Sequence, residues 1–367
     1  MPASPAIWIF GGRGDVGVRL ATILTMQTRR SIVLCSRDGE KASAVAQHIG
    51  ERVKGYGLDL SCATAVTSVS PGSSVINLTE ATHPDFAKAA VRTGGTFIES
   101  AATPDYVRLV YKAAQVAGRG LVVVNAGLMP GLSNVLTDAL GKNVAKVTTA
   151  DVVIEMGMGR HYGEAATRWM IRSLGDSYDA FDNCAAQKVL PGDLRRSVLF
   201  GEDQTAKPAL GFPFSVQLDV ADSELEAVRS YLAIEPAWMT RLIGALLRLR
   251  LGKHVSRADA KIERFLRRMP VVGRRKTRLF VEGLDRDGKP IASVQVTSGD
   301  QADLTAQMLA ETLAVAEGAS RRGVVETQHV MKPARALKTV KRASPNTDVF
   351  FSSQAVEDAV MSGKKVK

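Results

Sequence analysis

In Ala6-Ile-Trp-Ile-Phe-Gly-Gly-Arg-Gly-Asp-Val-Gly-Val-Arg-Leu-Ala-Thr-Ile-Leu24, an apolar run is followed by closely spaced glycines and then by a helical pattern. Residues 7–10 are typical of a strand buried on both faces, as in a parallel sheet that helices cover on both sides. From Val16 onward, apolar residues recur at i, i+4, i+7 and i+8, so one face of a helix can pack on the sheet. The stretch therefore predicts a strand, a tight turn and a helix.

The glycines of this turn have the spacing of a dinucleotide-binding loop. Gly12, Gly14 and Gly17 fit G-x-G-x-x-G, in which the glycines allow the turn, the approach of a pyrophosphate and close packing of helix on strand. The motif follows a strand and opens a helix, which is the context that supports the assignment. Free N–H groups at the helix start then favour the phosphates. We expect residues 12–17, including Arg13, Asp15 and Val16, to bind the cofactor.

The end of the second predicted strand, residues 31–34, indicates which cofactor binds. An NAD enzyme usually places an acidic residue there, about 20 residues after the glycines. This chain has Ser36 and Arg37, whose hydroxyl and guanidinium suit the 2′-phosphate of NADP(H). Asp38 is assigned to the N-cap of a helix over residues 40–49. An ordinary surface cation is the alternative for Arg37.

Strand and helix signals continue to alternate through residue 125, which predicts a doubly wound parallel sheet. Further strands are expected at 53–58, 75–78, 96–99 and 121–125, and helices at 85–93 and 104–117. Asp59 and Leu60, after the third strand, would border the adenine. Asn77 would contact the nicotinamide ribose at the switch region of the sheet.

Gly127-Leu-Met-Pro-Gly-Leu-Ser-Asn134 predicts a sharp turn into a helix over residues 135–140. A helix start at the cleft would favour an anionic part of a substrate, and a plain interdomain hinge fits the same sequence. Beyond it the pattern indicates an α+β module. Strands are expected at 147–155, 188–200 and 214–220, a hairpin at 278–283 and 290–297, and helices at 164–174 and 302–317.

Composition limits the class of protein. At 367 residues with 45% hydrophobic residues, two domains are expected. Cys35, Cys62 and Cys184 have no metal-ligand spacing, so we expect free thiols in a reducing compartment and no metal. Without a basic leader or a long apolar run, a cytoplasmic protein is predicted.

The positive charge is concentrated in one stretch. Between Arg241 and Arg278 the sequence contains thirteen Lys or Arg residues and only two acidic residues, Asp259 and Glu263, so the net charge of this stretch is 13 − 2 = +11. A solvated face, an acidic carrier protein and an anionic membrane surface all fit this block. Nucleic acid is not expected, because aromatic residues for base stacking are nearly absent. The apolar helix predicted at 236–251 fits a subunit interface or a membrane surface.

The chain resembles the saccharopine dehydrogenase (saccharopine reductase) family over residues 6–140, with a weaker similarity at 298–306 and 323–325. The resemblance is carried by Gly11-Gly-Arg-Gly-Asp-Val-Gly17, Ser36-Arg37, the segment from Val75 to Ser100, and above all Asn125-Ala-Gly-Leu-Met-Pro-Gly-Leu-Ser-Asn134. Saccharopine-forming members have an acidic residue before the Pro-Gly turn. Met129 occupies that position here, which argues against saccharopine as the substrate.

The resemblance implies an α/β protein: a Rossmann domain (1–130), an inserted α+β substrate and dimerisation domain (131–322), and a C-terminal segment (323–367) that returns to the first. It also implies a homodimer and NADPH-dependent reduction of an imine formed from an amine and a keto compound. The substrate would contact Ser100, Met129, Pro130, Gly131 and Asn134.

No proton donor is evident from the sequence itself. His161 and Tyr162, in a glycine-rich loop, are candidates for general acid or substrate contact, and Glu99 is a candidate for holding a substrate ammonium. Two alternatives keep the cofactor site: an enoyl or keto reductase for a lipidic or carrier-bound acyl chain, and a dinucleotide-binding protein without catalysis.

Overall fold

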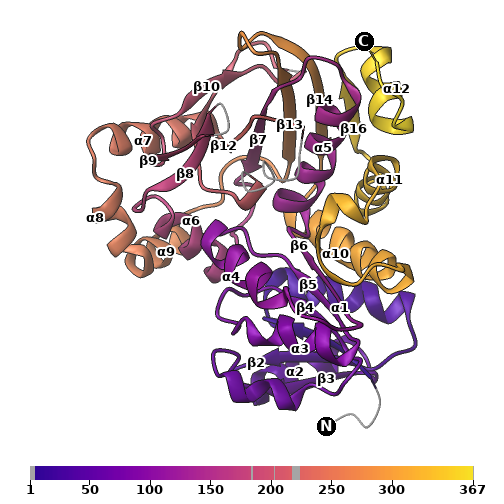
Figure 1. The fold of residues 1–367 in the computed structure, drawn as a ribbon. Coiled ribbons are helices and arrows are strands. Elements are labelled where there is room, and N and C mark those ends of the chain that lie inside the picture. The colour runs from indigo at the N-terminus through magenta and orange to yellow at the C-terminus, as the bar shows by residue number, and fades with distance from the viewer. Residues whose placement is uncertain (1–4, 183–184, 202, 217–223, 367) are drawn as a thin grey trace. The chain divides into compact units, whose positions relative to one another are not determined.

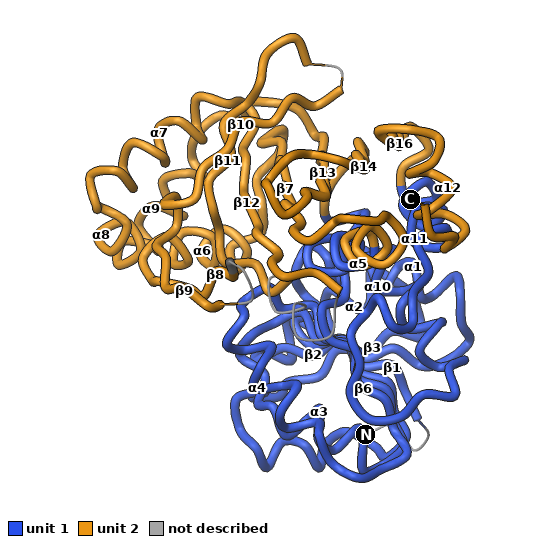
Figure 2. The backbone as a smooth tube through the Cα atoms, turned by 45° about the horizontal axis from the view of Figure 1, so that its top comes forward, with its two compact units in different colours: residues 1–135, 302–343 blue, residues 136–301, 344–367 orange. Residues whose placement is uncertain are grey.

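A computed structural model describes residues 5–182, 185–201, 203–216 and 224–366. The chain forms two compact units, coloured separately in Figure 2. Unit 1 comprises residues 1–135 and 302–343, and unit 2 comprises residues 136–301 and 344–367. Each unit is described by itself.

Unit 1 is built on a parallel sheet, as the sequence predicts (Figure 1). In the described residues its order is β15-β6-β5-β4-β1-β2-β3, so the strand sequence 3-2-1-4-5-6 of a doubly wound fold is extended by one strand. The strands are β1 (Ile7–Phe10), β2 (Ile32–Ser36), β3 (Val53–Gly57), β4 (Ser74–Asn77), β5 (Thr96–Glu99), β6 (Leu121–Val124) and β15 (Gly323–Glu326).

Helices cover both faces of this sheet. They are α1 (Asp15–Gln27), α2 (Gly39–Ile49), α3 (Asp85–Thr93), α4 (Pro104–Ala114), α10 (Gln301–Gly318) and α11 (Pro333–Ala343), with 3-10 turns η1 (Ala63–Ser68) and η4 (Thr327–His329). Residues of α1, α2 and α10 share one buried core with the face that carries Ile7 and Ile9. On the other face Phe10 packs against Phe86 of α3 with ring centroids 4.9 Å apart. This burial on both faces explains the unbroken apolar run of β1.

Unit 2 contains a second, mixed sheet. Its strands are β7 (Thr149–Gly157), β8 (Tyr178–Asp182), β9 (Ala185–Val189), β10 (Arg195–Val198), β11 (Lys207–Gly211), β12 (Ala227–Glu235), β13 (Thr277–Leu284), β14 (Pro290–Ser298) and β16 (Asp348–Phe351). The helices are α6 (Glu164–Arg172), α7 (Ala237–Arg248), α8 (Gly252–Arg257), α9 (Asp259–Arg268) and α12 (Gln354–Ser362), and α5 (Ser133–Asn143) runs into this unit from unit 1.

The second sheet confirms the predicted hairpin and corrects other expectations. β13 and β14 pair antiparallel, as expected, within the order β10-β11-β12-β7-β13-β14-β16, while β8 and β9 pair with each other. The sequence analysis missed β12, which runs parallel to β7 along its whole length. The strand expected at 214–220 falls partly outside the described residues, as does Cys184. The segment 188–200 forms the end of β9 and the separate strand β10.

The C-terminal segment divides between the two sheets. β15 pairs with β6 in unit 1, but β16 pairs with β14 in unit 2. Of residues 323–367, which were expected to return to the Rossmann domain, 323–343 belong to unit 1 and 344–367 belong to unit 2, where β16 completes the edge of the second sheet. The expected domain limits at 130 and 322 stay a prediction.

Among the described residues, no helix is long and apolar enough to cross a membrane.

Candidate cofactor and active site

The turn after β1 is built by close backbone contacts. Gly11 has φ +75°, a left-handed conformation that favours glycine, and its N–H donates to the carbonyl of Cys35 at 3.1 Å. The sequence analysis assigned the tight turn to Gly12, whereas the left-handed residue is Gly11. A Cβ at Gly12 would lie 2.9 Å from the carbonyl oxygen of Ile9, so the strand itself excludes a side chain there.

The third glycine of the motif lets α1 approach the turn. A Cβ at Gly17 would lie 2.7 Å from backbone atoms of Gly12, closer than such atoms approach in proteins. Gly14 is the N-cap of α1 and no side chain caps the helix. The positive N-terminal end of α1 therefore lies beside glycine backbone that no side chain covers. This arrangement holds phosphates in dinucleotide folds. Asp15, in the first turn, forms an ion pair with Arg19 at 2.9 Å. Val16 is the next residue of that turn.

Cations and carboxylates lie together at the tip of β2. Asp38 caps α2 as predicted, accepting the Lys41 N–H at 3.0 Å and pairing with the Lys41 ammonium at 2.8 Å. The hydrogen bonds from Lys41, and the charges of Lys41 and Arg13, lower the pKa of the Asp38 carboxyl. Arg37 is exposed and makes no hydrogen bond or ion pair within the described chain. The sequence analysis missed Lys41, whose position depends on the cap.

Ser36 and Asp59 already have partners at this edge. The Ser36 hydroxyl donates to the carbonyl of Asp38 at 2.7 Å, which differs from the expected donation to a phosphate. Asp59 accepts the Ser61 hydroxyl at 2.7 Å, and this bond, the Ser61 N–H and the charge of Arg37 lower the pKa of its carboxyl. Leu60 is buried, and its carbonyl accepts the N–H of His83 at 2.7 Å.

A buried polar network lies where β4 and β5 end. Asn77 pairs with Phe10 of β1 on one side and with Glu99 of β5 on the other, so it lies at the switch point of the sheet. Its Nδ2 donates to Glu99 Oε2 at 2.7 Å, and its Oδ1 accepts the Thr82 hydroxyl at 2.7 Å. The Asn77 carbonyl accepts the Ser100 hydroxyl at 2.7 Å. These bonds fix the orientation of the amide.

Glu99 is completely buried. Its Oε1 accepts the N–H of Ala101 at 2.8 Å, and burial raises the pKa of the carboxyl to about 8. Tyr106 of α4 completes the network: its hydroxyl donates to the Thr82 carbonyl at 2.9 Å and accepts from Asn77 Nδ2 at 3.1 Å. The sequence analysis missed Tyr106 and Thr82. Contact of Glu99 with a substrate ammonium stays a prediction.

The segment 127–134 is a buried, kinked turn in the structure. Met129, Pro130 and Gly131 are all buried, and Gly131 has φ +132°. The side chain of Asn134 accepts the Gly131 N–H at 2.9 Å and the Ser133 hydroxyl at 3.0 Å. Helix α5 starts at Ser133, two residues before the predicted start. Its second residue, Asn134, already accepts hydrogen bonds from the turn. These two hydrogen bonds hold the turn, and its contact with a substrate stays a prediction.

His161 and Tyr162 belong to unit 2, whereas Glu99 belongs to unit 1. His161 is exposed. The Tyr162 hydroxyl donates to the Gly157 carbonyl at 2.9 Å, and burial raises its pKa to about 12. The Arg160 guanidinium lies over the Tyr162 ring, 4.9 Å from its centroid, and pairs with Asp300 at 2.7 Å. The Tyr162 hydroxyl is thus held by its own loop. It could donate its proton elsewhere only after the hydrogen bond to the Gly157 carbonyl breaks.

No cluster of acidic, His or Cys side chains among the described residues could hold a metal ion. Cys35 is buried, and burial raises the pKa of its thiol to about 12.

No known family model matches the sequence, and no curated protein matches it either. The fold, by contrast, is known. The structure aligns with apo saccharopine dehydrogenase (L-Glu forming) from Saccharomyces cerevisiae at TM-score 0.63 and 12% identity, over 95% of this chain and 100% of that one. An engineered D-amino acid dehydrogenase aligns at TM-score 0.41 and 13% identity, over 89% and 95% of the two chains. The diaminopimelate (DAP) dehydrogenase of C. glutamicum, in complex with DAP, aligns at 0.41 and 12%, over 89% and 94%. Over almost its whole length, then, this chain has the fold of a saccharopine dehydrogenase: a Rossmann unit joined to an α+β unit.

Proposed function

We propose that the protein is an NADPH-dependent oxidoreductase that reduces the imine of an amino-acid-like substrate. The observation that supports a cofactor site is the glycine turn after β1 together with the cations near the end of β2. Gly12 and Gly17 leave no room for side chains where α1 meets β1, and α1 starts without a side-chain cap. These features suit the pyrophosphate.

The cations at the end of β2 support NADP(H) over NAD(H). Arg37 is exposed, and Arg13 and Lys41 act electrostatically on Asp38 beside it. Because the Asp38 carboxylate is engaged by Lys41, its oxygens are occupied by the helix cap. A 2′-phosphate would then meet cations at this edge, and Arg37 would hold it by charge-assisted hydrogen bonds.

The imine substrate is supported by the shared fold. Saccharopine dehydrogenase (L-Glu forming) is a solved protein whose fold this chain shares, and its name indicates that it forms an amino acid. The bound nucleotide would supply a hydride, and the protein would supply position and electrostatics. Asn77 would orient the nicotinamide side of the cofactor, with Glu99, Tyr106 and Thr82 holding the amide in place.

The substrate would lie against Ser100 and the turn formed by Met129, Pro130, Gly131 and Asn134, all in unit 1. A proton-donating role for His161 or Tyr162 stays a prediction from the sequence. Met129 stands before the Pro-Gly turn, so we expect a substrate other than saccharopine. A homodimer and a cytoplasmic location stay predictions from the sequence.

The test is NADPH oxidation followed by absorbance with paired amines and keto acids. We expect oxidation only when an amine and a keto acid are both present, because their imine is the acceptor. Acyl thioesters serve as the second arm. Turnover with a thioester alone would overturn the imine assignment, and NADPH binding without turnover on the whole panel would favour a protein without catalysis.

A further inference from the structure

Helix α7 presents an apolar stripe to solvent. Trp238 and Leu242 are 50% and 54% exposed, and their spacing of four residues places them on one face of the helix. Leu249, the C-cap residue of α7, is 70% exposed. The opposite face packs inward through Thr240, Gly244 and Leu247, which are buried. Side chains of this size are usually covered, so a stripe of them marks an interaction surface.

Cations border the stripe. Arg241 and Arg248 lie on the same side of α7 as each other, next to the apolar face, and both are exposed. The loop at 271–275 lies beside the start of α7, because the Arg274 N–H donates to Glu235 Oε2 at 2.8 Å. That loop adds the half-exposed Val271 and Val272 and the exposed Arg274 and Arg275. Helix α7 and the adjoining loop thus expose both apolar and cationic side chains.

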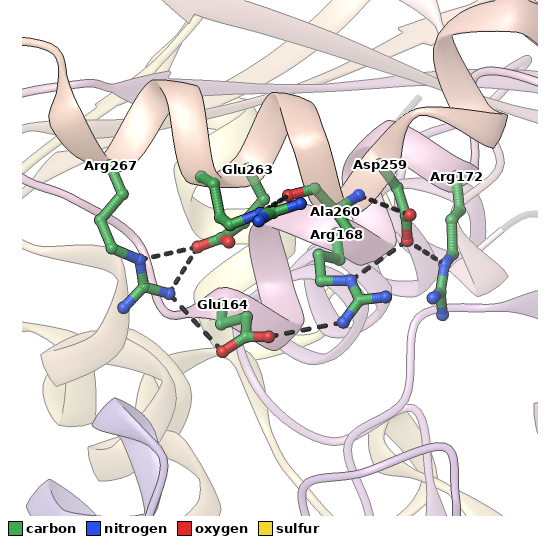
Figure 3. Close-up of polar contacts among 8 residues, drawn as sticks. Glu164, Arg168, Arg172, Asp259, Ala260, Glu263 and Arg267 are labelled. Atoms are coloured by element: carbon green, nitrogen blue, oxygen red, sulfur yellow. Dashed lines mark hydrogen bonds and ion pairs between the residues drawn. The ribbon is translucent and has the colours of Figure 1, made fainter.

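The two acidic residues of this region are buried and contact arginines, as Figure 3 shows. Asp259 is 8% exposed and accepts from Arg168 of α6 at 3.2 Å and from Arg172. Glu263 is 5% exposed and pairs with Arg267. Arg278, which the sequence analysis counted with the block, is also buried and pairs with Asp203 at 2.7 Å and with Glu155.

We call residues 237–275 the cationic lobe. Because its two acidic residues are buried, its exposed charged side chains are almost all positive. Most of its exposed cations make no ion pair within the described chain: Arg241, Arg248, Lys253, Arg257, Lys261, Arg264, Arg268, Arg274 and Arg275. Two others, Arg250 and Arg267, pair with Asp193 and with Glu263 and Glu164.

We propose that the cationic lobe docks on an anionic phospholipid bilayer, with the α7 stripe at the boundary of headgroups and acyl chains. An exposed apolar stripe bordered by Arg is the pattern of a helix that lies in a membrane interface. A second copy of this chain on the same surface would bring like charges together, which costs energy. A nucleic acid would satisfy the arginines but offers no apolar phase for Trp238 and Leu242. An acidic protein with an apolar groove is the rival occupant, and the experiment below distinguishes it from a bilayer.

The experiment is sedimentation of the full chain with vesicles of phosphatidylcholine alone or mixed with phosphatidylglycerol. We expect binding to the mixed vesicles that weakens as salt rises, and little binding to phosphatidylcholine. Brominated acyl chains should quench tryptophan fluorescence in the wild type and not in Trp238→Phe. Equal binding to neutral vesicles, or unquenched tryptophan in the bound protein, would overturn the proposal.

Two matched pairs of variants test whether binding depends on the cationic lobe itself or only on the total charge and hydrophobicity of the protein. Replacing Arg241, Arg248, Arg274 and Arg275 by Gln should weaken binding about 100-fold or more, since each surface cation contributes roughly fivefold. Replacing Arg92, Arg119, Arg321 and Lys338, exposed cations of unit 1, by Gln is the control.

Leu242→Asp should weaken binding by about tenfold or more, because it places a charge in the apolar phase. Leu109→Asp is its control, because Leu109 is 56% exposed on α4 of unit 1. Circular dichroism confirms that each variant is folded. An equal loss in variant and control, or binding to acidic polypeptide but not to vesicles, would refute lipid docking.

Discussion

Glu99 shows how a single buried carboxyl group shapes the candidate site. It ends β5, accepts hydrogen bonds from Asn77 and Ala101, and has no exposed surface. Burial disfavours its charged form and raises the pKa to about 8, so near neutral pH the carboxyl is largely protonated. Asn77, beside the end of β1, is positioned by this group rather than by flexible surface contacts.

The first prediction concerns Glu99→Gln, which mimics the protonated carboxyl. In the folded wild type the carboxyl holds its proton up to about pH 8, whereas its ordinary pKa is 4.5. Folding therefore takes up a proton in this range, and the stability of the wild type falls as pH rises from about 5 through 8. Glu99→Gln has no carboxyl group to titrate, so its free energy of unfolding should not fall in this way. Relative to the wild type, that free energy should rise with pH by a few kcal/mol, on the order of 1 kcal/mol for each unit of pKa shift.

Urea denaturation at pH 5.5, 7 and 8.5, roughly spanning that window, measures the difference. Glu282→Gln on β13 of unit 2 is a control for loss of a carboxylate elsewhere. A difference between Glu99→Gln and wild type that stays constant or shrinks with pH would contradict the buried neutral acid.

The second prediction concerns Arg37 at the tip of β2. Arg37→Ala should weaken NADPH binding about tenfold or more and leave NADH binding nearly unchanged, because only NADPH carries the 2′-phosphate. Fluorescence titration with both nucleotides measures the two affinities. Arg92→Ala, an exposed arginine of α3 in the same unit, is the control. Equal loss for both nucleotides would show that Arg37 does not recognise the phosphate.

At the scale of elements, the junction of β1 and α1 depends on contact between two glycines. A methyl group at Gly17 would meet Gly12 backbone atoms at 2.7 Å, and neither the strand nor the helix start has a flexible side chain that could yield. We predict that Gly17→Ala displaces α1, costs about 1–3 kcal/mol of stability and weakens NADPH binding.

Chemical denaturation and nucleotide titration of the same preparation test this prediction. Gly318→Ala, at the end of α10, is the matched control, since nothing lies within 4 Å of its added Cβ. If Gly17→Ala binds NADPH like the wild type, the close packing of helix on turn is not needed for the cofactor.

The elements also show what local sequence can and cannot predict. β1, α1 and the Asp38 cap have local signals, namely an apolar run, a helical period and a capping residue, and all three are confirmed. β12 was missed because its alternation is broken and its stability comes from pairing with β7, nearly 80 residues earlier in the chain. Contacts between distant strands leave no local signal.

The same reason explains what was missed in the site. Asn77 and Glu99 were candidates because each ends a predicted strand, which the sequence shows directly. Tyr106 lies on α4 and meets Asn77 only in the folded chain, so neither this contact nor the full burial of Glu99 has a local sequence signal. Gly11 was passed over because a spacing rule does not give a backbone angle.

At the scale of the whole molecule, the chain passes between its two units more than once. Unit 1 is completed by residues 302–343, which add α10 to its core and β15 to its sheet, and unit 2 is completed by β16. Neither sheet is therefore finished until late in the chain. The fold is that of saccharopine dehydrogenase, while the residue before the Pro-Gly turn is Met129 rather than an acid.

The glycine turn of unit 1 and the cations at the end of β2 are proposed to bind NADPH. Isothermal titration calorimetry of the full chain with NADPH, and then with NADH, measures this binding. We predict saturable binding of NADPH with an affinity at least about tenfold higher than that of NADH, as expected for one charge-assisted phosphate contact. Saturable binding of neither nucleotide, with the protein shown to be folded, would contradict the account.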